Sequence, residues 1–185
     1  MADKTAVDAR EVQRLRTETG AGVMDCKRAL EESHGDYEKA KDILRQKGLA
    51  AAAKRAGREA REGVVESYIH SGGRIGALVE LSSETDFVAR NPEFKELARN
   101  IAMQIAAMSP IVVSEDELTS EARSEIVKEH GGDEKKAIET AVLLKQPYIR
   151  DNTKTVGDLV AALAQSTGEN VKVRRFARFQ LGAAA

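Results

Sequence analysis

The chain contains no tryptophan, only one cysteine and only 4% aromatic residues in 185. With so few rings, a buried core must be packed mostly with Ala, Val, Leu and Ile, a composition that favours helices. The lone Cys26 excludes an internal disulfide framework and suits a reducing compartment. No apolar run approaches the roughly 20 residues that span a bilayer, and the N-terminus lacks the apolar stretch of a signal peptide. We therefore expect a cytoplasmic protein, or an organelle-matrix protein already trimmed, that does not contact a membrane.

The chain also lacks an excess of charge of either sign. The 29 Lys and Arg residues are balanced by 30 Asp and Glu residues, which gives a formal net charge of -1. No net field therefore draws the whole protein to nucleic acid. At 42% hydrophobic and 32% charged, the chain can bury a core in one ordinary domain or two small ones.

The residue patterns of common enzymes are absent as well. The sequence has no Gly-rich dinucleotide loop, no phosphate-binding P-loop and no HExxH zinc motif. Its three histidines and Cys26 lie far apart, without the spacing of metal ligands. We therefore expect neither an enzyme, nor a metal site, nor a cofactor.

Three short helical patterns fill residues 1–50 and predict a three-helix bundle. Thr5 and Asp8 resemble a capping pair for the first helix, and residues 19–22 interrupt the pattern. The second helix is expected near 23–33, with an inward face of Val23, Cys26, Ala29 and Leu30. The third is expected to run from a cap at Asp36 to Gly48. Residues 51–62 are alanine-rich and basic, and we interpret them as a solvated helical linker rather than a nucleic-acid arm.

Residues 63–185 change in character and predict an α+β core domain. Two β-rich runs, 64–70 and 75–81, flank Gly72-Gly73 and indicate an antiparallel hairpin in which Tyr68 pairs with Ala77. This register puts apolar residues on both faces of the sheet: Ile75, Ala77, Val79 and Leu81 on one, Val65, Ile69 and Leu78 on the other.

The rest of this core alternates between helical and extended patterns. Asn91-Pro92-Glu93 is a strong helix start, and the helix that follows is expected to have one apolar stripe, made of Phe94, Leu97, Ala98, Ile101, Ile105 and Met108. Thr155 with Asp158 caps another helix. Further helices are expected near 120–130 and 133–145. The final strand, 170–181, is expected to place on one face Val171, Val173, Ala177, Phe179 and Leu181. Strands without regular crossover helices favour an α+β fold.

The segment from Glu84 to Val88 places Phe87 in a polar connection between a strand and a helix. Two interpretations are open at this stage. Asp86 can cap a short turn while Phe87 packs into the core. Alternatively, Phe87 is a hydrophobic wedge presented to a partner, of the kind found at interface hot spots.

Four separated motifs resemble the elongation factor Ts family, in family order from about residue 6 to residue 182. They are LRTETGAGVMDCKRAL at 15–30, TDFVARN at 85–91, QPY at 146–148, and GENV at 168–171 followed by RRF at 174–176. Longer family members carry a duplicated core, a helical-hairpin insertion and a C-terminal extension. This chain resembles the compact form with one core unit, and its sheet has a second apolar face. We therefore expect that a homodimer covers that face.

The resemblance implies a guanine-nucleotide exchange factor that promotes GDP release from the GTPase elongation factor Tu. It also implies a ubiquitin-associated-like fold for the N-terminal bundle, which docks on the GTPase through Gly22, Val23 and Met24. The exchange wedge near the bound magnesium is then Thr85, Asp86, Phe87 and Val88. His70, in a Tyr-x-His-x-Gly stretch, is a weaker candidate for a partner contact. Such a factor needs no catalytic acid, base or cofactor, because it only weakens the phosphate and Mg²⁺ contacts of GDP.

Two other functions remain open from the sequence. The bundle can be a ubiquitin-associated-like module that binds a protein without exchange activity, which leaves the hairpin and the Asp86-Phe87 segment without a role. An RNA-binding protein is the third possibility. It depends on basic residues at Lys54, Arg55, Arg58, Arg61, Arg174 and Arg175.

Overall fold

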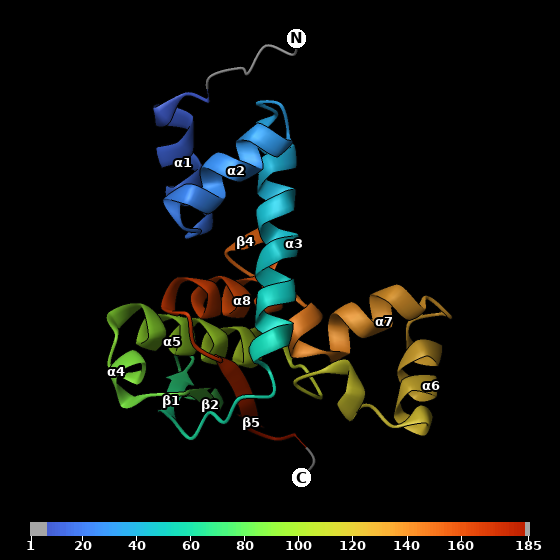
Figure 1. Ribbon diagram of the computed structural model, residues 1–185. Helices are drawn as coiled ribbons and strands as arrows, with labels where there is room; N and C mark the ends of the chain where they lie inside the picture. Colours follow the sequence, from blue (N-terminus) through green and yellow to red (C-terminus); the bar gives the residue numbers. More distant parts are fainter. Residues whose placement is uncertain (1–6, 184–185) are drawn as a thin grey trace.

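The computed structural model describes residues 7–183. Figure 1 shows three N-terminal helices standing above a larger core, in which further helices lie against a small sheet. A pair of shorter helices, α6 and α7, extends from the side of that core. The α+β class, with a three-helix bundle ahead of a small antiparallel sheet packed with helices, is confirmed.

The bundle consists of α1 (Ala9–Thr19), α2 (Val23–Glu32) and α3 (Tyr37–Arg55). The cap of α1 is Asp8, whose carboxylate accepts from the amide of Arg10 at 2.9 Å, while Thr5 lies outside the described residues. Gly20 ends α1 with a φ of 68°, a conformation that glycine adopts without strain. Small and aliphatic side chains form the bundle's own core: Val12, Leu15, Ala21, Cys26, Ala29, Leu30, Ala40 and Leu44.

Helix α3 does not end at Gly48, as the sequence predicts, but continues to Arg55. A glycine inside a helix costs about 1 kcal/mol relative to alanine, and tertiary packing overrides that cost here. At Gly48 the helix passes close to α8 (Val156–Thr167), because a Cβ added there would lie 2.7 Å from Oε1 of Gln165. Part of the linker expected at 51–62 is therefore a continuation of α3. The division into domains at 1–50 and 63–185 stays a prediction.

The main sheet has the order β1-β2-β5 and is antiparallel throughout. Its strands are β1 (Glu62–Ile69), β2 (Ile75–Ser83) and β5 (Lys172–Gln180). The predicted hairpin register is confirmed, since Tyr68 pairs with Ala77 and Glu66 with Val79. The Gly-Gly turn therefore fixes which residues of β1 and β2 share a face.

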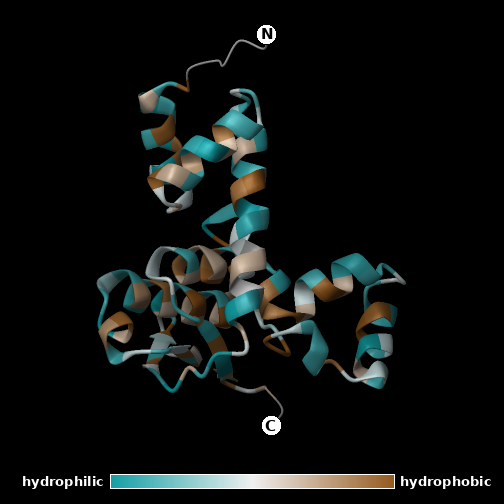
Figure 2. Cartoon of the chain, in the orientation of Figure 1, coloured by the Kyte–Doolittle hydropathy of each residue, from teal (hydrophilic) through white to brown (hydrophobic). Residues whose placement is uncertain are grey.

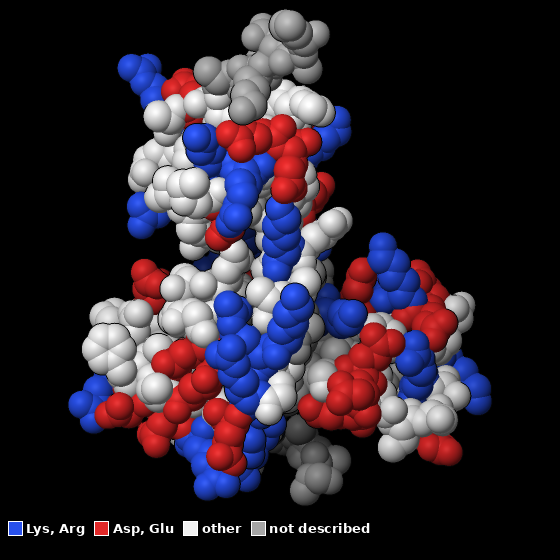
Figure 3. Space-filling view, in the orientation of Figure 1, with Lys and Arg blue, Asp and Glu red and all other residues white. Residues whose placement is uncertain are grey.

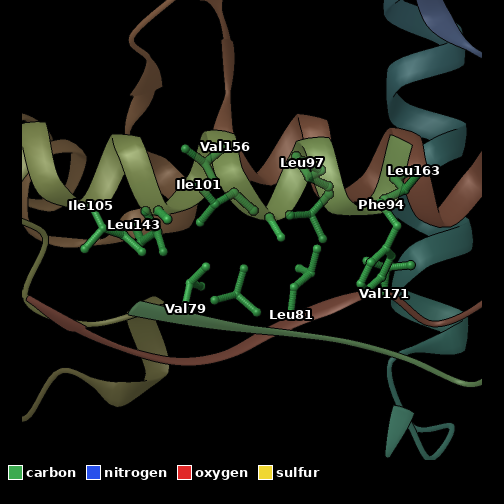
Figure 4. Close-up of a cluster of buried hydrophobic side chains, with 14 of the residues drawn as sticks. Val79, Leu81, Phe94, Leu97, Ile101, Ile105, Leu143, Val156, Leu163 and Val171 are labelled. Carbon is green, nitrogen blue, oxygen red and sulfur yellow. The ribbon is translucent and has the colours of Figure 1, made fainter. Parts of the chain in front are cut away.

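One face of this sheet is buried and the other is exposed. Ala77, Val79 and Leu81 are buried beneath α5 (Pro92–Met108). Figure 4 shows Val79 and Leu81 pointing at a layer that includes Phe94, Leu97, Ile101 and Ile105 of α5. On the opposite face Val65, Ile69 and Leu78 are exposed. The predicted two-sided apolar hairpin is confirmed, and only one of its faces is covered in the single chain.

The face prediction for the last strand is wrong in its second half. Leu81 pairs with Val173 and Glu80 with Arg175, so Arg174 is an extra residue in β5. Such a bulge reverses the alternation of the side chains beyond it. Val171 and Val173 are buried as predicted. Beyond the bulge Phe176 packs on the core, whereas the outward residues are Ala177, Phe179 and Leu181.

Helices α5 and α8 have the predicted starts. Asn91 caps α5 and Pro92 occupies its first turn, while Thr155 and Asp158 form a capping box at α8. The predicted apolar stripe of α5 is correct except for Met108, which is 41% exposed at the end of the helix. Along the helices in Figure 2 apolar segments alternate with polar ones, the pattern of amphipathic helices that cover a core on one side.

The remaining elements connect α5 to α8. Helices α6 (Ser120–Glu129) and α7 (Glu134–Ala141) lie at the two predicted positions, and Arg123 of α6 pairs with Glu134 of α7 at 2.9 Å. A two-stranded ribbon, β3 (Pro147–Tyr148) and β4 (Asp151–Thr155), was not predicted. The buried amide of Gln104 holds this ribbon against α5, because it donates to the carbonyl of Pro147 and accepts from the amide of Ile149.

Candidate functional site

The segment between β2 and α5 folds as a single helical turn, α4 (Asp86–Ala89). Thr85, rather than Asp86, caps it, because the Thr85 hydroxyl accepts from the amide of Val88 at 3.4 Å. Val88 and Ala89 are buried in the main core. The turn is therefore attached to the core on one side by two apolar residues.

Phe87 points away from that attachment and is 83% exposed. Of the two interpretations open from the sequence, the packed core residue is therefore excluded in the isolated chain. An exposed large aromatic side chain on a capped and anchored turn is a typical protein-binding feature. Val88 belongs to the same motif but is buried, so its side chain supports the turn instead of sharing the exposed surface.

Asp86 lies beside Phe87 and forms a surface ion pair. Its carboxylate is 2.8 Å from the guanidinium of Arg90, one turn later in the chain, and both side chains are more than half exposed. Exposed pairs of this kind contribute at most about 1 kcal/mol. Asp86 can therefore exchange Arg90 for a group on a partner at little cost.

The second predicted contact region lies at the start of α2. Gly22 is the N-cap of this helix and provides no side-chain hydrogen bond. Val23 is 45% exposed and Met24 is 63% exposed, so the expectation that Val23 packs inside the bundle is wrong. Cys26 on the same helix is fully buried, and burial raises the pKa of its thiol. A thiol in this state packs and does not act as a nucleophile.

The two exposed apolar regions come from different parts of the fold but share a side of it. In the view of Figure 1 both α2 and α4 lie to the left of α3, whereas α6 and α7 lie to its right.

His70 lies elsewhere. It follows β1 at the hairpin turn, whereas Thr85 follows the opposite end of β2. The nine residues of β2 separate the two ends, which corresponds to roughly 30 Å of strand. The His70 ring is exposed, and its Nδ1 lies 3.1 Å from the hydroxyl of Tyr68. His70 is therefore not part of the same local site as Phe87.

Most of the basic residues that suggested RNA binding are engaged in ion pairs. Arg58 lies 3.4 Å from Glu84, Arg61 pairs with Glu59, and Glu80 pairs with both Arg174 and Arg175. On the face shown in Figure 3, acidic side chains flank the basic ones that gather over the lower part of α3. This arrangement differs from the uninterrupted basic stripe that follows a phosphate backbone.

Within residues 7–183 no group of three or more His, Cys, Asp or Glu side chains has the arrangement of a metal site. In the same range, no helix combines the length and the apolar character needed to cross a membrane.

Sequence reasoning missed two polar residues beside the exposed turn. Glu169 and Asn170 stand in the GENV motif that carries the family resemblance, yet nothing in the sequence alone connects them to residues 84–87. The fold brings them together, because the carboxylate of Glu169 accepts hydrogen bonds from the amides of both Glu84 and Thr85 at 3.1 Å.

Comparison with known proteins identifies the family. The family model described as Elongation factor TS matches residues 37–183. A protein named Elongation factor Ts from Carboxydothermus hydrogenoformans is 50% identical, over 95% of this chain and 89% of its own length. The protein of the same name from Caldanaerobacter subterraneus is 50% identical, over 95% of this chain and 97% of its own length. That from Thermotoga maritima is 46% identical, over 92% of this chain and 94% of its own length. A match of this extent shows that the chain belongs to the elongation factor Ts family.

Proposed function

We propose that the chain promotes GDP release from elongation factor Tu by docking through Val23 and Met24 and inserting Phe87 beside the magnesium and phosphate site of that GTPase. Membership of the elongation factor Ts family implies the coarser role, a nucleotide-exchange factor whose partner is elongation factor Tu. The observation that carries the finer proposal is the 83% exposure of Phe87 on an anchored turn.

The mechanism that we propose involves no covalent step. A GTPase holds GDP largely through phosphate contacts to backbone amides, a P-loop and Mg²⁺. An aromatic side chain that displaces the elements beside the metal weakens these contacts. Such a mechanism needs only a rigid apolar group and a docking surface, and the exposed side chains of Phe87 on α4 and Met24 on α2 support assigning these two roles to them.

The direct test is stopped-flow release of a fluorescent GDP analogue from elongation factor Tu, with and without the chain. We expect much faster release in its presence. A parallel experiment immobilises the chain, captures nucleotide-free elongation factor Tu and adds GDP, which should elute the GTPase. A ubiquitin-associated-like module without exchange activity would bind its partner but would leave the release rate unchanged and would be insensitive to GDP.

A further inference from the structure

The helix that presents Phe87 is too short to be stable by itself. It has four residues, and the cost of helix nucleation makes even isolated helices of about a dozen residues marginal in water. Val88 and Ala89 attach its inner side to the core. The entry of the turn needs a separate support, because the backbone amides that precede and begin a helix have no partner within it.

Glu169 supplies this support from the other end of the sequence. Its Oε2 accepts from the amides of Glu84 and Thr85 at 3.1 Å each, and its Oε1 accepts from the Thr85 hydroxyl at 2.6 Å. Because the Thr85 proton is directed to Glu169, the hydroxyl lone pairs remain free to cap the amide of Val88. One carboxylate therefore fixes both the backbone that enters α4 and the side chain that caps it.

The position of Glu169 is itself fixed by its neighbours. Gly168 ends α8 with a φ of 73°. Asn170 is 4% exposed, and its side-chain amide donates to the carbonyl of Arg58 at 2.7 Å, just beyond the end of α3. The Asn170 backbone amide donates to the carboxylate of Glu84 at 2.6 Å. The support under α4 is thereby connected to the end of the helix that carries the N-terminal bundle.

We infer that Glu169 is the positioning residue of the exchange site, which holds the Thr85 cap and thereby orients Phe87 toward the GTPase. This inference rests on the proposed function of Phe87. Glu169 acts through the turn and does not itself contact the partner's nucleotide site. Its removal should therefore slow GDP release at saturation more than it weakens docking through α2.

The test compares Glu169→Ala, Glu169→Gln and Glu129→Ala as full-length chains. Glu129 is exposed and forms no ion pair or side-chain hydrogen bond among the described residues, so its variant controls for the lost charge. For Glu169→Ala we expect the maximal rate of GDP-analogue release to fall about tenfold, the equivalent of one charge-assisted hydrogen bond. The half-saturating concentration should change by about twofold at most. Glu169→Gln keeps an acceptor for the Thr85 hydroxyl and should recover part of the rate.

A purely structural effect is separated by two further measurements. The first is amide hydrogen exchange at Glu84 and Thr85, which should be faster in Glu169→Ala than in Glu129→Ala. The second repeats Glu169→Ala in the Phe87→Ala background, where its effect on release should vanish if Glu169 acts through Phe87. The same rate loss in both backgrounds would overturn the inference, as would a full rate in Glu169→Ala while Phe87→Ala is slow. If Phe87→Ala alone keeps the full rate, the proposed function of Phe87 is wrong. Amide exchange at Thr85 then tests Glu169 separately: an unchanged exchange rate in Glu169→Ala would refute its positioning role as well.

Discussion

Replacing Phe87 with alanine should slow nucleotide exchange strongly and leave the fold intact. Less than a fifth of the Phe87 surface is buried in the isolated chain, since the side chain is 83% exposed. Fully burying a phenylalanine is worth about 3 kcal/mol at most, so truncation at this position should cost roughly 0.5 kcal/mol or less of unfolding free energy. The melting temperature should hardly change.

The binding free energy lost at an interface with the partner should be larger than this loss of unfolding free energy. A hot-spot aromatic residue contributes about 2 kcal/mol or more to binding, which corresponds to roughly thirtyfold slower GDP release if the contact forms in the exchanging complex. The assay pairs thermal melting of each variant with stopped-flow release of a fluorescent GDP analogue from elongation factor Tu.

Two other phenylalanines of the chain provide matched controls. Phe179 is 67% exposed on β5, so Phe179→Ala makes the same chemical change away from α4 and should leave release unchanged. Phe94 is fully buried, and Phe94→Ala should lower the unfolding free energy by about 3–5 kcal/mol. If Phe87→Ala melted like Phe94→Ala, the turn would depend on the ring for stability. A normal release rate in Phe87→Ala would refute the wedge role.

Three further outcomes are expected elsewhere in the chain. Met24→Ser should raise the half-saturating concentration about tenfold without lowering the melting temperature, because Met24 is 63% exposed; unchanged saturation would refute docking through α2. Gly48→Ala should stabilise the chain by roughly 0.5–1 kcal/mol by thermal melting, since the added Cβ meets only the flexible end of Gln165; a lower melting temperature would show that the α3–α8 contact cannot adjust. A second copy of the chain should cover the exposed sheet face, so light scattering at micromolar concentration should give a dimer mass that Ile69→Asp reduces to a monomer; a monomeric mass for the unmodified chain would contradict this.

Local signals in the sequence predicted local structure well. The Gly72-Gly73 turn gave the hairpin register, and the helix starts at Asn91 and Thr155 were correct. Each of these signals acts between groups a few residues apart, and so a single sequence contains all the information needed.

Several errors depend on contacts between distant segments. The bulge at Arg174 belongs to the pairing of β5 with β2, and α3 packs on α8 where it continues through Gly48. The hydrogen bonds between Glu169 and Thr85 join residues 84 positions apart in the sequence, and no local pattern predicts them. The exposure of Phe87 could not be predicted for a similar reason. The sequence does not show which residues of the turn face the core, and in the fold these are Val88 and Ala89.

The preformed turn α4 should reduce the free-energy cost of binding a partner. Because α4 is capped and Phe87 is already exposed, binding needs little ordering of this segment, and more of the contact free energy remains for displacing elements of the GTPase.

Linkage makes the effect of the Phe87 contact on GDP affinity reciprocal. If this contact lowers GDP affinity about thirtyfold, GDP must lower the affinity of the chain for elongation factor Tu by the same factor. Phe87→Ala should therefore reduce the difference between the affinities for nucleotide-free and GDP-bound elongation factor Tu, in addition to slowing release. Met24→Ser should weaken both affinities alike, because docking through α2 does not distinguish the two states. The proposal thus predicts separable roles for the two exposed regions: variants in α2 should change how much complex forms, and variants in α4 should change how strongly that complex excludes GDP.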